Sequence, residues 1–360
     1  MDKIKVLHII TAEVWGGGEE AAYSMCNVLS INNYEVYTIL SSKNDFFVKR
    51  FSECSIVKNI NLNSYNKILN IFKIKKFIID NNIKIVNVHS GKIVATIVLL
   101  KYLINDLKIV SFRHNLLNSK KDLLHKFLYS KIDIFICVSE AVYNQQIRNI
   151  SSKIKNKFHI VHNGIDIKKY ETYLSKNDRK HNDIFTVGYA GRIEENKGLY
   201  ILIKAVESLS KKYQVNLKIA GDYSNAYGEF IQEYIKDKKD IFELTGFQKN
   251  MNDFYQSIDF FVLPSIVPEA FGLVLCEAMF YEKPVITTDS GAQHEIINKR
   301  IDGFIISKNS VEQLEEVLEF LIKNPLEARK IGRNAKQKVI SNFTIDIWFE
   351  KMDKIYRFLL

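Results

Sequence analysis

Short apolar runs rich in β-branched residues alternate with longer amphipathic stretches throughout this 360-residue chain. Such runs predict strands, and apolar strands alternating with helices are typical of parallel sheets covered on both faces. The predicted strands span residues 5–10, 35–40, 83–88, 108–112, 132–138 and 158–161, then 184–190, 215–220, 241–244, 259–263, 284–288 and 303–306. The pattern therefore predicts an α/β protein with two consecutive doubly wound domains, divided within the polar stretch 166–183.

We place the domains at residues 1–168 and 169–343, followed by a terminal helix over 344–360. That helix carries an apolar stripe at helical spacing, formed by Ile345, Trp348, Phe349, Met352, Tyr356 and Leu359. The stripe must pack on another element, and the first domain is one solution.

The basic residues are concentrated in the first half of the chain. Residues 1–170 contain 25 Lys and Arg against 13 Asp and Glu, whereas residues 171–360 contain 26 against 28. Either a solvated lysine-rich face or an anionic partner explains this excess. A nucleic acid is not expected, because the basic residues are not interleaved with an aromatic platform or a known binding motif.

Cysteines and apolar runs favour a cytoplasmic protein. The four cysteines show neither paired nor metal-type spacing. The N-terminus enters an apolar strand without a signal-peptide layout, and the longest apolar run, 93–100, is far shorter than the ~20 residues of a spanning helix. Two lysine-rich apolar stretches, 66–80 and 118–131, read either as solvated helix faces or as shallow contacts with the inner face of the plasma membrane.

Two carboxylates stand eight positions apart in the stretch 260–297. Glu269 follows Pro268 in a loop, while Glu277 lies in an otherwise apolar helix. A buried carboxylate is costly unless hydrogen-bond donors reach it. A structural Lys or Arg could supply them, and so could the two hydroxyls of a ligand diol, and the sequence leaves both open.

Glycines and cations follow the strands of the second domain. Arg192 and Lys197 come after its first strand, between Gly191 and Gly198, and suit either a diphosphate or surface ion pairs. Gly221 and Gly246 end the next two strands, as close approach of a ligand would require. The sequence contains no D-x-D and no His/Cys cluster of metal-ligand spacing, so we expect no cofactor and no metal.

The first domain has a glycine-rich turn and two histidines at predicted strand ends. Gly16, Gly17 and Gly18 lie at the entrance of a helix, and the turn only weakly matches a dinucleotide fingerprint. His89 and His114 follow the third and fourth predicted strands. Structural and functional roles stay open for the turn and for both histidines.

Together, the segments GGGEE, VHNGID (161–166), GRIEENKG (191–198), PEAFGLVLCEA and GAQHEII resemble glycosyltransferase family four, which is retaining and has the GT-B architecture of two Rossmann-like domains. The resemblance implies a nucleotide-sugar donor, UDP- or GDP-linked, bound by the second domain. The resemblance implies that Arg192 and Lys197 form a pyrophosphate clamp. It also implies that Glu269 lies beside the transferred sugar and that Glu277 binds the ribose hydroxyls. It also makes His114 the active-site histidine, and it assigns donor contacts to Gly16, Gly17, Gly191, Gly221, Gly246, Phe271, Gly272, Leu273 and Val274.

The resemblance further implies metal-independent transfer to a glycan or lipid-linked glycan acceptor, in the synthesis of cell-surface polysaccharide or glycolipid. Ala292 and His294 depart from the residues frequent in the family, which bears on sugar preference. Two alternatives remain: a nucleotide-sugar epimerase with the same two-domain layout, and a non-catalytic nucleotide-sugar binder.

Overall fold

The computed structural model describes residues 3–12, 14–42, 44–62, 67–148, 150–170, 184–248 and 250–360, without the side chains of residues 67 and 68. The chain forms two compact units: residues 1–164 with 345–360, and residues 165–344. The first unit ends at residue 164, four residues before the expected boundary at 168/169. Ile165 already belongs to the second unit, because it pairs with Thr344 and its N–H donates to Phe343 O. Most of the polar stretch expected to divide the domains, residues 171–183, lies outside the described residues.

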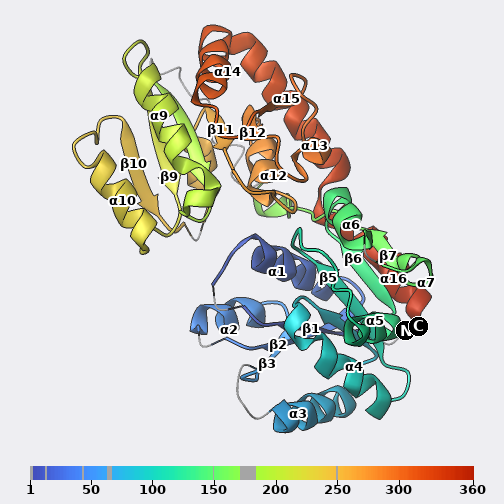
Figure 1. The fold of residues 1–360 in the computed structure, drawn as a ribbon. Coiled ribbons are helices and arrows are strands. Elements are labelled where there is room, and N and C mark those ends of the chain that lie inside the picture. The colour runs from blue at the N-terminus through green and yellow to red at the C-terminus, as the bar shows by residue number, and fades with distance from the viewer. Residues whose placement is uncertain are drawn as a thin grey trace. The chain divides into compact units, whose positions relative to one another are not determined.

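The first unit is built on a seven-stranded sheet in which every pair is parallel (Figure 1). Its strand order is β3-β2-β1-β4-β5-β6-β7. The strands are β1 (Ile4–Ile10), β2 (Tyr34–Leu40), β3 (Ile56–Asn59), β4 (Ile85–Val88), β5 (Lys108–Arg113), β6 (Ile134–Cys137) and β7 (Phe158–Ile160). The helices are α1 (Gly17–Ser30), α2 (Asp45–Ser52), α3 (Lys67–Asp80), η1 (Gly91–Ile93), α4 (Val94–Leu103), α5 (Leu123–Lys131), α6 (Glu140–Ile147), α7 (Ser152–Lys155) and the terminal α16 (Ile345–Leu359).

The second unit repeats the design with six parallel strands in the order β10-β9-β8-β11-β12-β13. The strands are β8 (Phe185–Ala190), β9 (Val215–Ala220), β10 (Phe242–Gly246), β11 (Phe260–Leu263), β12 (Val285–Thr288) and β13 (Phe304–Ile306). The helices are η2 (Glu195–Lys197), α9 (Leu199–Leu209), α10 (Ala226–Ile235), α11 (Asn252–Ser257), α12 (Leu273–Phe280), α13 (Gln293–Ile296), α14 (Val311–Lys323) and α15 (Pro325–Asn342).

The predicted α/β class with two doubly wound parallel sheets is confirmed, and all twelve predicted strands are present with ends within two residues of those expected. The prediction missed one strand, β3. It is a short strand at the sheet edge, and three of its four residues are exposed. Because such a strand buries almost nothing, it lacks the apolar run by which the others are recognised.

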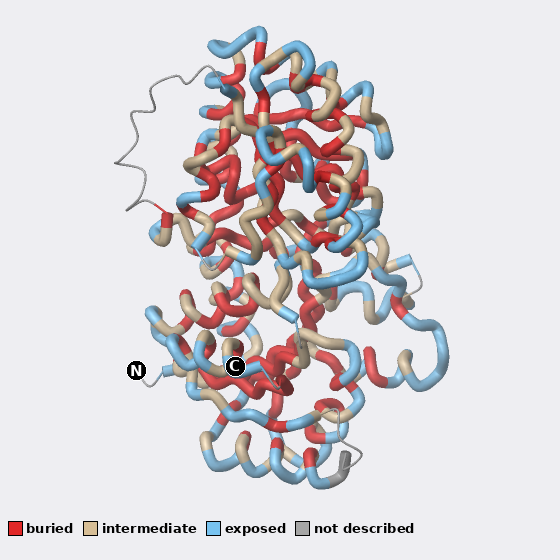
Figure 2. The backbone as a smooth tube through the Cα atoms, turned by 90° about the vertical axis from the view of Figure 1, so that its left-hand side faces the viewer, coloured by how far each residue is buried: buried red, intermediate tan, exposed pale blue. Residues whose placement is uncertain are grey.

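Buried residues concentrate on the strands and on the helix faces that cover them, as the tube in Figure 2 shows for each unit. Helix α16 buries Ile345, Trp348, Met352 and Tyr356, one residue per turn. This face packs in the first unit, where Tyr356 and Phe349 contact the ring of Tyr34. The apolar stripe expected from the sequence therefore corresponds to a buried face.

Candidate functional site

Each sheet has a point at which the strand order reverses. In the first sheet β1 and β4 are neighbours, and in the second β8 and β11 are neighbours. Ligands of open α/β sheets bind outside the carboxyl ends of the strands at this switch point. The glycine turn and His89 follow β1 and β4, while Lys197 and Glu269 come after β8 and β11. Sequence reasoning thus selected residues at the switch point of both sheets.

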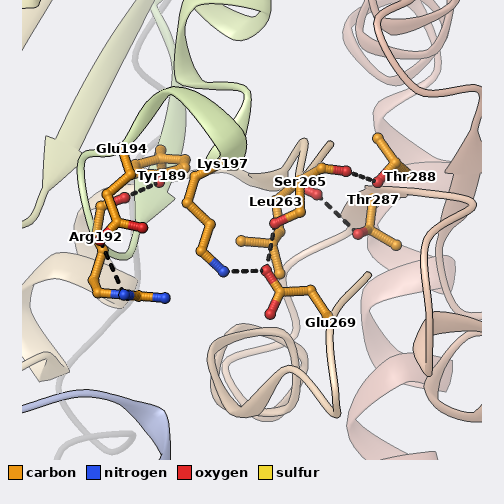
Figure 3. Close-up of polar contacts among 9 residues, drawn as sticks. All are labelled: Tyr189, Arg192, Glu194, Lys197, Leu263, Ser265, Glu269, Thr287 and Thr288. Atoms are coloured by element: carbon orange, nitrogen blue, oxygen red, sulfur yellow. Dashed lines mark hydrogen bonds and ion pairs between the residues drawn. The ribbon is translucent and has the colours of Figure 1, made fainter. Parts of the chain in front are cut away.

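Lys197 and Glu269 meet in the second unit (Figure 3). Lys197 Nζ lies 2.6 Å from Glu269 Oε1, and the Ser265 hydroxyl donates to the same oxygen. The two charged side chains are only 13% and 17% exposed, so solvent screens this ion pair less than a surface pair. Within the described part of the chain, hydrogen bonds reach Oε1 of this carboxylate and none reaches Oε2.

The loops after β8 and β11 are tied together where these side chains meet. Gly198 has a φ of 71°, and a Cβ atom there would lie 2.1 Å from Pro264 O. Just before it, Asn196 O accepts hydrogen bonds from the N–H groups of Ile266 and Val267, at 2.9 and 3.3 Å. Only glycine allows so close an approach in this conformation, and the approach sets Lys197 beside Glu269.

The end of β12 supports the same loop. Thr287 Oγ1 donates to Leu263 O at 2.8 Å, and Thr288 Oγ1 donates to Ser265 O (Figure 3). These two hydroxyls hold the backbone on either side of Pro264. The position of the Ser265 side chain follows from them.

The segment GAQHEII holds the backbone of Glu269. Glu269 N donates to Ser290 O at 3.0 Å, and Ala292 N donates to Glu269 O at 2.9 Å. Gly291 between them has a φ of 90°, and a Cβ there would lie 2.3 Å from Glu269 O. Of the two departures noted in the sequence, Ala292 is fully buried, whereas His294 is exposed and lies 2.7 Å from Asp289.

Arg192 lies on an exposed ion pair. Its Nη1 is 2.9 Å from Glu194 Oε1, and its side chain is 57% exposed. The Tyr189 hydroxyl donates to its backbone carbonyl at 2.8 Å, which fixes the start of the loop (Figure 3). Of the two predicted clamp residues, Lys197 is therefore held in place and Arg192 is on the surface.

The predicted glycines at the strand ends also contact one another. A Cβ on Gly221 would lie 2.2 Å from Gly191 O, so backbone packing alone explains why residue 221 is glycine. Gly221 N donates to Gly246 O at 3.0 Å, and Gly246 has a φ of 71°. These glycines bring the ends of β8, β9 and β10 close together.

Glu277 is buried in α12, as the sequence predicted, at 8% exposure. Its Oε2 accepts a hydrogen bond of 2.6 Å from the hydroxyl of Tyr255 on α11. Burial, together with the charge of Glu277, raises the pKa of Tyr255 well above its usual value, so the phenol keeps its proton. The structure thus contains a donor that neither sequence alternative considered, a neutral hydroxyl.

The start of α12 lies between the two carboxylates. Gly272, with a φ of 120°, precedes the helix and contributes no side-chain cap. The first N–H groups of an α-helix lack intrahelical partners and attract negative charge. Leu273 and Val274 of the predicted donor contacts open this helix, and Phe271 before it is buried against Phe343.

The glycine turn of the first unit opens α1. Gly16 is the N-cap, and Cβ atoms on Gly17 or Gly18 would meet nothing within 4 Å. Packing among the described residues therefore does not explain the last two glycines. Trp15, just before them, packs its ring on Phe46, Phe47 and Phe51, which anchors the turn.

The two histidines at the strand ends are in contact. His89 Nδ1 lies 2.9 Å from His114 Nε2. Burial lowers the pKa of His114 to about 4, and burial with the two neighbouring histidines lowers that of His89 well below its usual value. Both imidazoles are thus neutral near pH 7.

Comparison with known proteins now assigns the family. A model of Glycosyltransferase Family 4 matches residues 15–169, and a model of Glycosyl transferases group 1 matches residues 171–338. The chain belongs to glycosyltransferase family 4. The resemblance predicted from the sequence is confirmed.

Family 4 relatives match over part of their length. A capsular polysaccharide biosynthesis glycosyltransferase, CapM of Staphylococcus aureus, is 30% identical over 254 residues, which cover 65% of each chain. An uncharacterized glycosyltransferase of Methanocaldococcus jannaschii is 29% identical over 59% of this chain and 56% of its own. The chain thus aligns with somewhat less than two thirds of these relatives' length.

Solved structures match over the whole chain. A glycosyltransferase from Rickettsia africae superposes with a TM-score of 0.88 at 22% identity and covers 100% of this chain and 99% of its own. Anabaena Alr3699/HepE, solved with UDP and glucose, superposes with a TM-score of 0.83 at 18% identity over 98% and 99%. The fold is therefore the GT-B fold of family 4 structures.

Several residues of this candidate site were not predicted from the sequence. Ser265 lies in a loop without a distinctive pattern. Gly291 begins the motif GAQHEII, but it is 22 positions from Glu269, and Tyr255 is likewise 22 positions from Glu277, so no local signal connects either pair. His8 did offer a signal, because it is a polar residue inside the apolar strand β1.

Proposed function

We propose that this protein is a retaining glycosyltransferase that moves a hexosyl group from a UDP- or GDP-sugar to a glycan or lipid-linked glycan acceptor. The observation that carries the proposal is the Lys197–Glu269–Ser265 cluster at the switch point of the second sheet, where one carboxylate oxygen is fixed and the other is left for a ligand. Family membership and the name of the S. aureus relative favour a role in cell-surface polysaccharide synthesis.

Lys197 and Arg192 would bind the diphosphate of the donor. The ammonium of Lys197 has three N–H groups, and one of them donates to Glu269. The other two can donate to phosphate oxygens. Arg192 is exposed and can leave Glu194, because exposed ion pairs contribute only about 0–1 kcal/mol. The opening turn of α12 would add backbone N–H groups to the same anion.

Glu269 would hold the transferred sugar. Its Oε1 is fixed by Lys197 and Ser265, so Oε2 can accept a hydrogen bond from a sugar hydroxyl. A carboxylate already paired with a cation is a poor nucleophile but still stabilises positive charge developing on the sugar. We therefore propose that Glu269 positions the sugar and stabilises the positive charge that develops on it.

In the transfer step the anomeric carbon–phosphate oxygen bond breaks, and a bond from the acceptor hydroxyl forms on the same face. The acceptor proton passes to the departing phosphate oxygen, and the nucleoside diphosphate leaves. Lys197 and Arg192 offset the negative charge that grows on that leaving group. No step in this scheme needs a metal, because the side-chain cations perform the electrostatic role.

Glu277 would accept the hydroxyls of the donor ribose. Tyr255 fixes Oε2 of this carboxylate, which orients the group within a largely apolar helix. A diol offers two donors to one carboxylate. Glu277 should therefore affect donor binding, whereas Glu269 should affect transfer.

The test begins with a thermal-shift and hydrolysis screen over UDP-, GDP- and ADP-sugars. With the sugar so identified, Glu269→Ala should lower kcat, and Glu277→Ala should mainly raise the donor Kd. Glu327→Ala is the matched control, since Glu327 forms an exposed pair with Lys330 on α15. Full transfer by both site variants would refute the site assignment, and epimerised nucleotide sugar as the product would refute the transferase.

We further propose that the first domain, residues 1–168 with helix 344–360, serves the acceptor and touches an anionic membrane. Helices α3, α4 and α5 are neighbours and expose large apolar side chains: Leu69, Phe72 and Ile79, then Leu99, Tyr102 and Leu103, then Leu123, Leu124 and Phe127. Exposed lysines lie on or beside them, among them Lys73, Lys121 and Lys126. Apolar side chains with interspersed lysines favour the interface of an anionic bilayer.

Sedimentation with vesicles tests the membrane proposal. Phosphatidylserine vesicles at low salt should retain the protein, neutral vesicles should retain less, and a Leu123→Ser, Leu124→Ser, Phe127→Ser variant should remain in solution. Equal sedimentation with and without vesicles would refute it. Among the described residues, no helix combines the length and apolar character needed to cross a bilayer.

A further inference from the structure

Three imidazoles of the first unit form one continuous line of hydrogen bonds. His8 Nδ1 lies 2.9 Å from His89 Nε2, and His89 Nδ1 lies 2.9 Å from His114 Nε2. The rings are nearly parallel, with 21° and 17° between neighbours, and Phe112 stacks on His89 at 4.8 Å. The line runs from the middle of β1 across the sheet to the residue that follows β5.

The line continues beyond His8 to the terminal helix. Asn87 is the neighbour of His8 in the β1–β4 register, and its Nδ2 lies 3.0 Å from His8 Nε2. The hydroxyl of Tyr356 on α16 donates to Asn87 Oδ1 at 3.0 Å. A phenol from a helix near the end of the chain thus terminates a polar line buried between sheet and helix.

All three imidazoles are neutral at physiological pH. Burial lowers the pKa of His8 to about 3 and that of His114 to about 4, and burial together with the two neighbouring histidines lowers the pKa of His89 well below its usual value. Burial also raises the pKa of Tyr356, so its hydroxyl keeps its proton. A neutral imidazole has one donor and one acceptor nitrogen. A ring that accepts a hydrogen bond on one side must therefore donate one on the other, so all hydrogen bonds of the line point the same way.

That direction is set at the tyrosine end. The Tyr356 hydroxyl donates to Asn87 Oδ1, which leaves the amide Nδ2, a donor, facing His8 Nε2. His8 Nε2 must then accept, so His8 Nδ1 carries the proton and donates to His89. The same reasoning makes His89 Nδ1 the donor to His114, and it puts the proton of His114 on Nδ1.

His114 Nδ1 is the open end of the line. This atom is buried, and no group of the described residues is its hydrogen-bond partner. We propose that Tyr356, Asn87, His8 and His89 are positioning residues that lock His114 in the Nδ1–H tautomer, so that it presents a donor to an oxygen of the bound sugar substrate. This proposal deepens the proposed function and rests on it for the nature of the ligand.

The opposite direction would leave the proton of the Tyr356 hydroxyl without an acceptor among the described residues, and it differs chemically at the other end of the line. If Asn87 were rotated, its oxygen would accept from His8 Nε2–H, and every proton would move to the other nitrogen. His114 Nδ1 would then be an acceptor and would face an oxygen acceptor of the substrate with a lone pair. The wrong imidazole tautomer at an active site can reduce catalysis severely even when the geometry is intact.

The first test reads the tautomers directly and does not depend on activity. Protein labelled with ¹⁵N-histidine is studied by long-range ¹H–¹⁵N correlation at pH 7.5, and His114→Gln and His8→Gln assign the two rings. We expect His8 and His114 to be protonated on Nδ1 and unprotonated on Nε2. Protonation of His114 on Nε2, or on both nitrogens, overturns the proposal.

Asn87→Asp provides a second reading. A carboxylate only accepts hydrogen bonds, so His8 Nε2 must gain a proton in this variant. A His8 Nε2 that stays bare in Asn87→Asp, or already carries a proton in the natural chain, also overturns the proposal.

The kinetic test compares two tyrosines, of which only Tyr356 belongs to the line of hydrogen bonds. Tyr356→Phe removes the hydroxyl that sets the direction, and Tyr34→Phe removes a neighbouring buried hydroxyl that donates to Asp353 on the same helix. With the best nucleotide sugar of the screen, Tyr356→Phe should lower kcat about 3- to 10-fold at unchanged donor KM, as the loss of one hydrogen bond predicts. Tyr34→Phe should change kcat by less than about twofold, because it leaves the line intact.

The outcomes separate this proposal from the proposed function. Equal kcat losses in both tyrosine variants, or an unchanged His114 tautomer in Tyr356→Phe, would mean that Tyr356 serves only helix packing and would overturn the proposal. A protein that turns over no nucleotide sugar but shows Nδ1–H on His114 would refute the transferase and leave the tautomer lock standing.

Discussion

Gly198→Ala isolates the contact that brings Lys197 to Glu269. The added Cβ would lie 2.1 Å from Pro264 O, and Cβ atoms in proteins essentially never approach another heavy atom within 3.0 Å. The loop after β8 and the loop after β11 must therefore separate by at least 0.9 Å (3.0 minus 2.1). Asn196, Lys197 and Ser265 all lie within three residues of this contact.

The cost has two parts. A side chain in the left-handed region costs roughly 1–2 kcal/mol, and forcing two packed loops apart adds about 1–3 kcal/mol. For a unit of this size, roughly 1 kcal/mol lowers Tm by about 2–4 °C, so we expect a decrease of about 5–15 °C. A shift of about 1 Å between Lys197 and Glu269 should lower sugar transfer by about 10- to 100-fold.

Gly246→Ala supplies the control for stability. Gly246 has the same φ of 71°, but a Cβ there would meet only the Tyr223 ring, at 3.9 Å. It therefore incurs the backbone cost without the clash, and we expect a Tm decrease of about 2–8 °C. Thermal unfolding and nucleotide-sugar turnover are measured on both variants. Equal Tm values for the two variants, with wild-type turnover in Gly198→Ala, would refute this account of how the two loops are held.

Three further predictions follow from buried groups and from the donor site. Tyr255→Phe removes one hydrogen bond to buried Glu277 and should cost about 1–3 kcal/mol in urea unfolding, with weaker binding of the nucleotide sugar; an unchanged Kd for the nucleotide sugar would separate Glu277 from the ribose. Because burial lowers the pKa of His8 and His114 to about 3 and 4 from 6.5, the unfolded chain takes up protons first. Their contribution to stability is complete above pH 6.5 and decreases as pH falls toward 4, by about 1.4 kcal/mol per histidine at pH 5.5; a flat unfolding free energy between pH 7.5 and 5.5 would contradict this. Treatment with EDTA should leave transfer unchanged, and recovery of a lost activity by Mg²⁺ or Mn²⁺ would refute metal independence.

The sequence predicted the fold well because the strands are buried. A strand covered on both faces must be apolar along its length, so central strands such as β1, β4, β11 and β12 were visible as apolar runs. The exposed edge strand β3 was not. The terminal helix was visible for a related reason, since its stripe spaces one buried residue per turn.

The candidate site was predictable only in part. Lys197 and Glu269 are 72 positions apart, yet sheet topology brings the ends of β8 and β11 together, so their meeting could be expected. The hydrogen bond from Tyr255 to Glu277 could not be expected, because Tyr255 reaches the carboxylate from a short helix whose orientation no local pattern encodes. The line from Tyr356 to His114 depends on five residues from four parts of the chain, and only the finished fold aligns them.

The ion pairs around Glu269 limit how much net charge can contribute to binding of the nucleotide sugar. Lys197 and Arg192 are each paired with a carboxylate, Glu269 and Glu194, so these four side chains sum to no net charge. A diphosphate entering the site would gain little from net attraction until Arg192 leaves Glu194. Directed donors should therefore contribute more than charge: the remaining N–H groups of Lys197 and the opening N–H groups of α12. It follows that Gly272, which sets the start of that helix at a φ of 120°, should matter for donor binding as much as either cation.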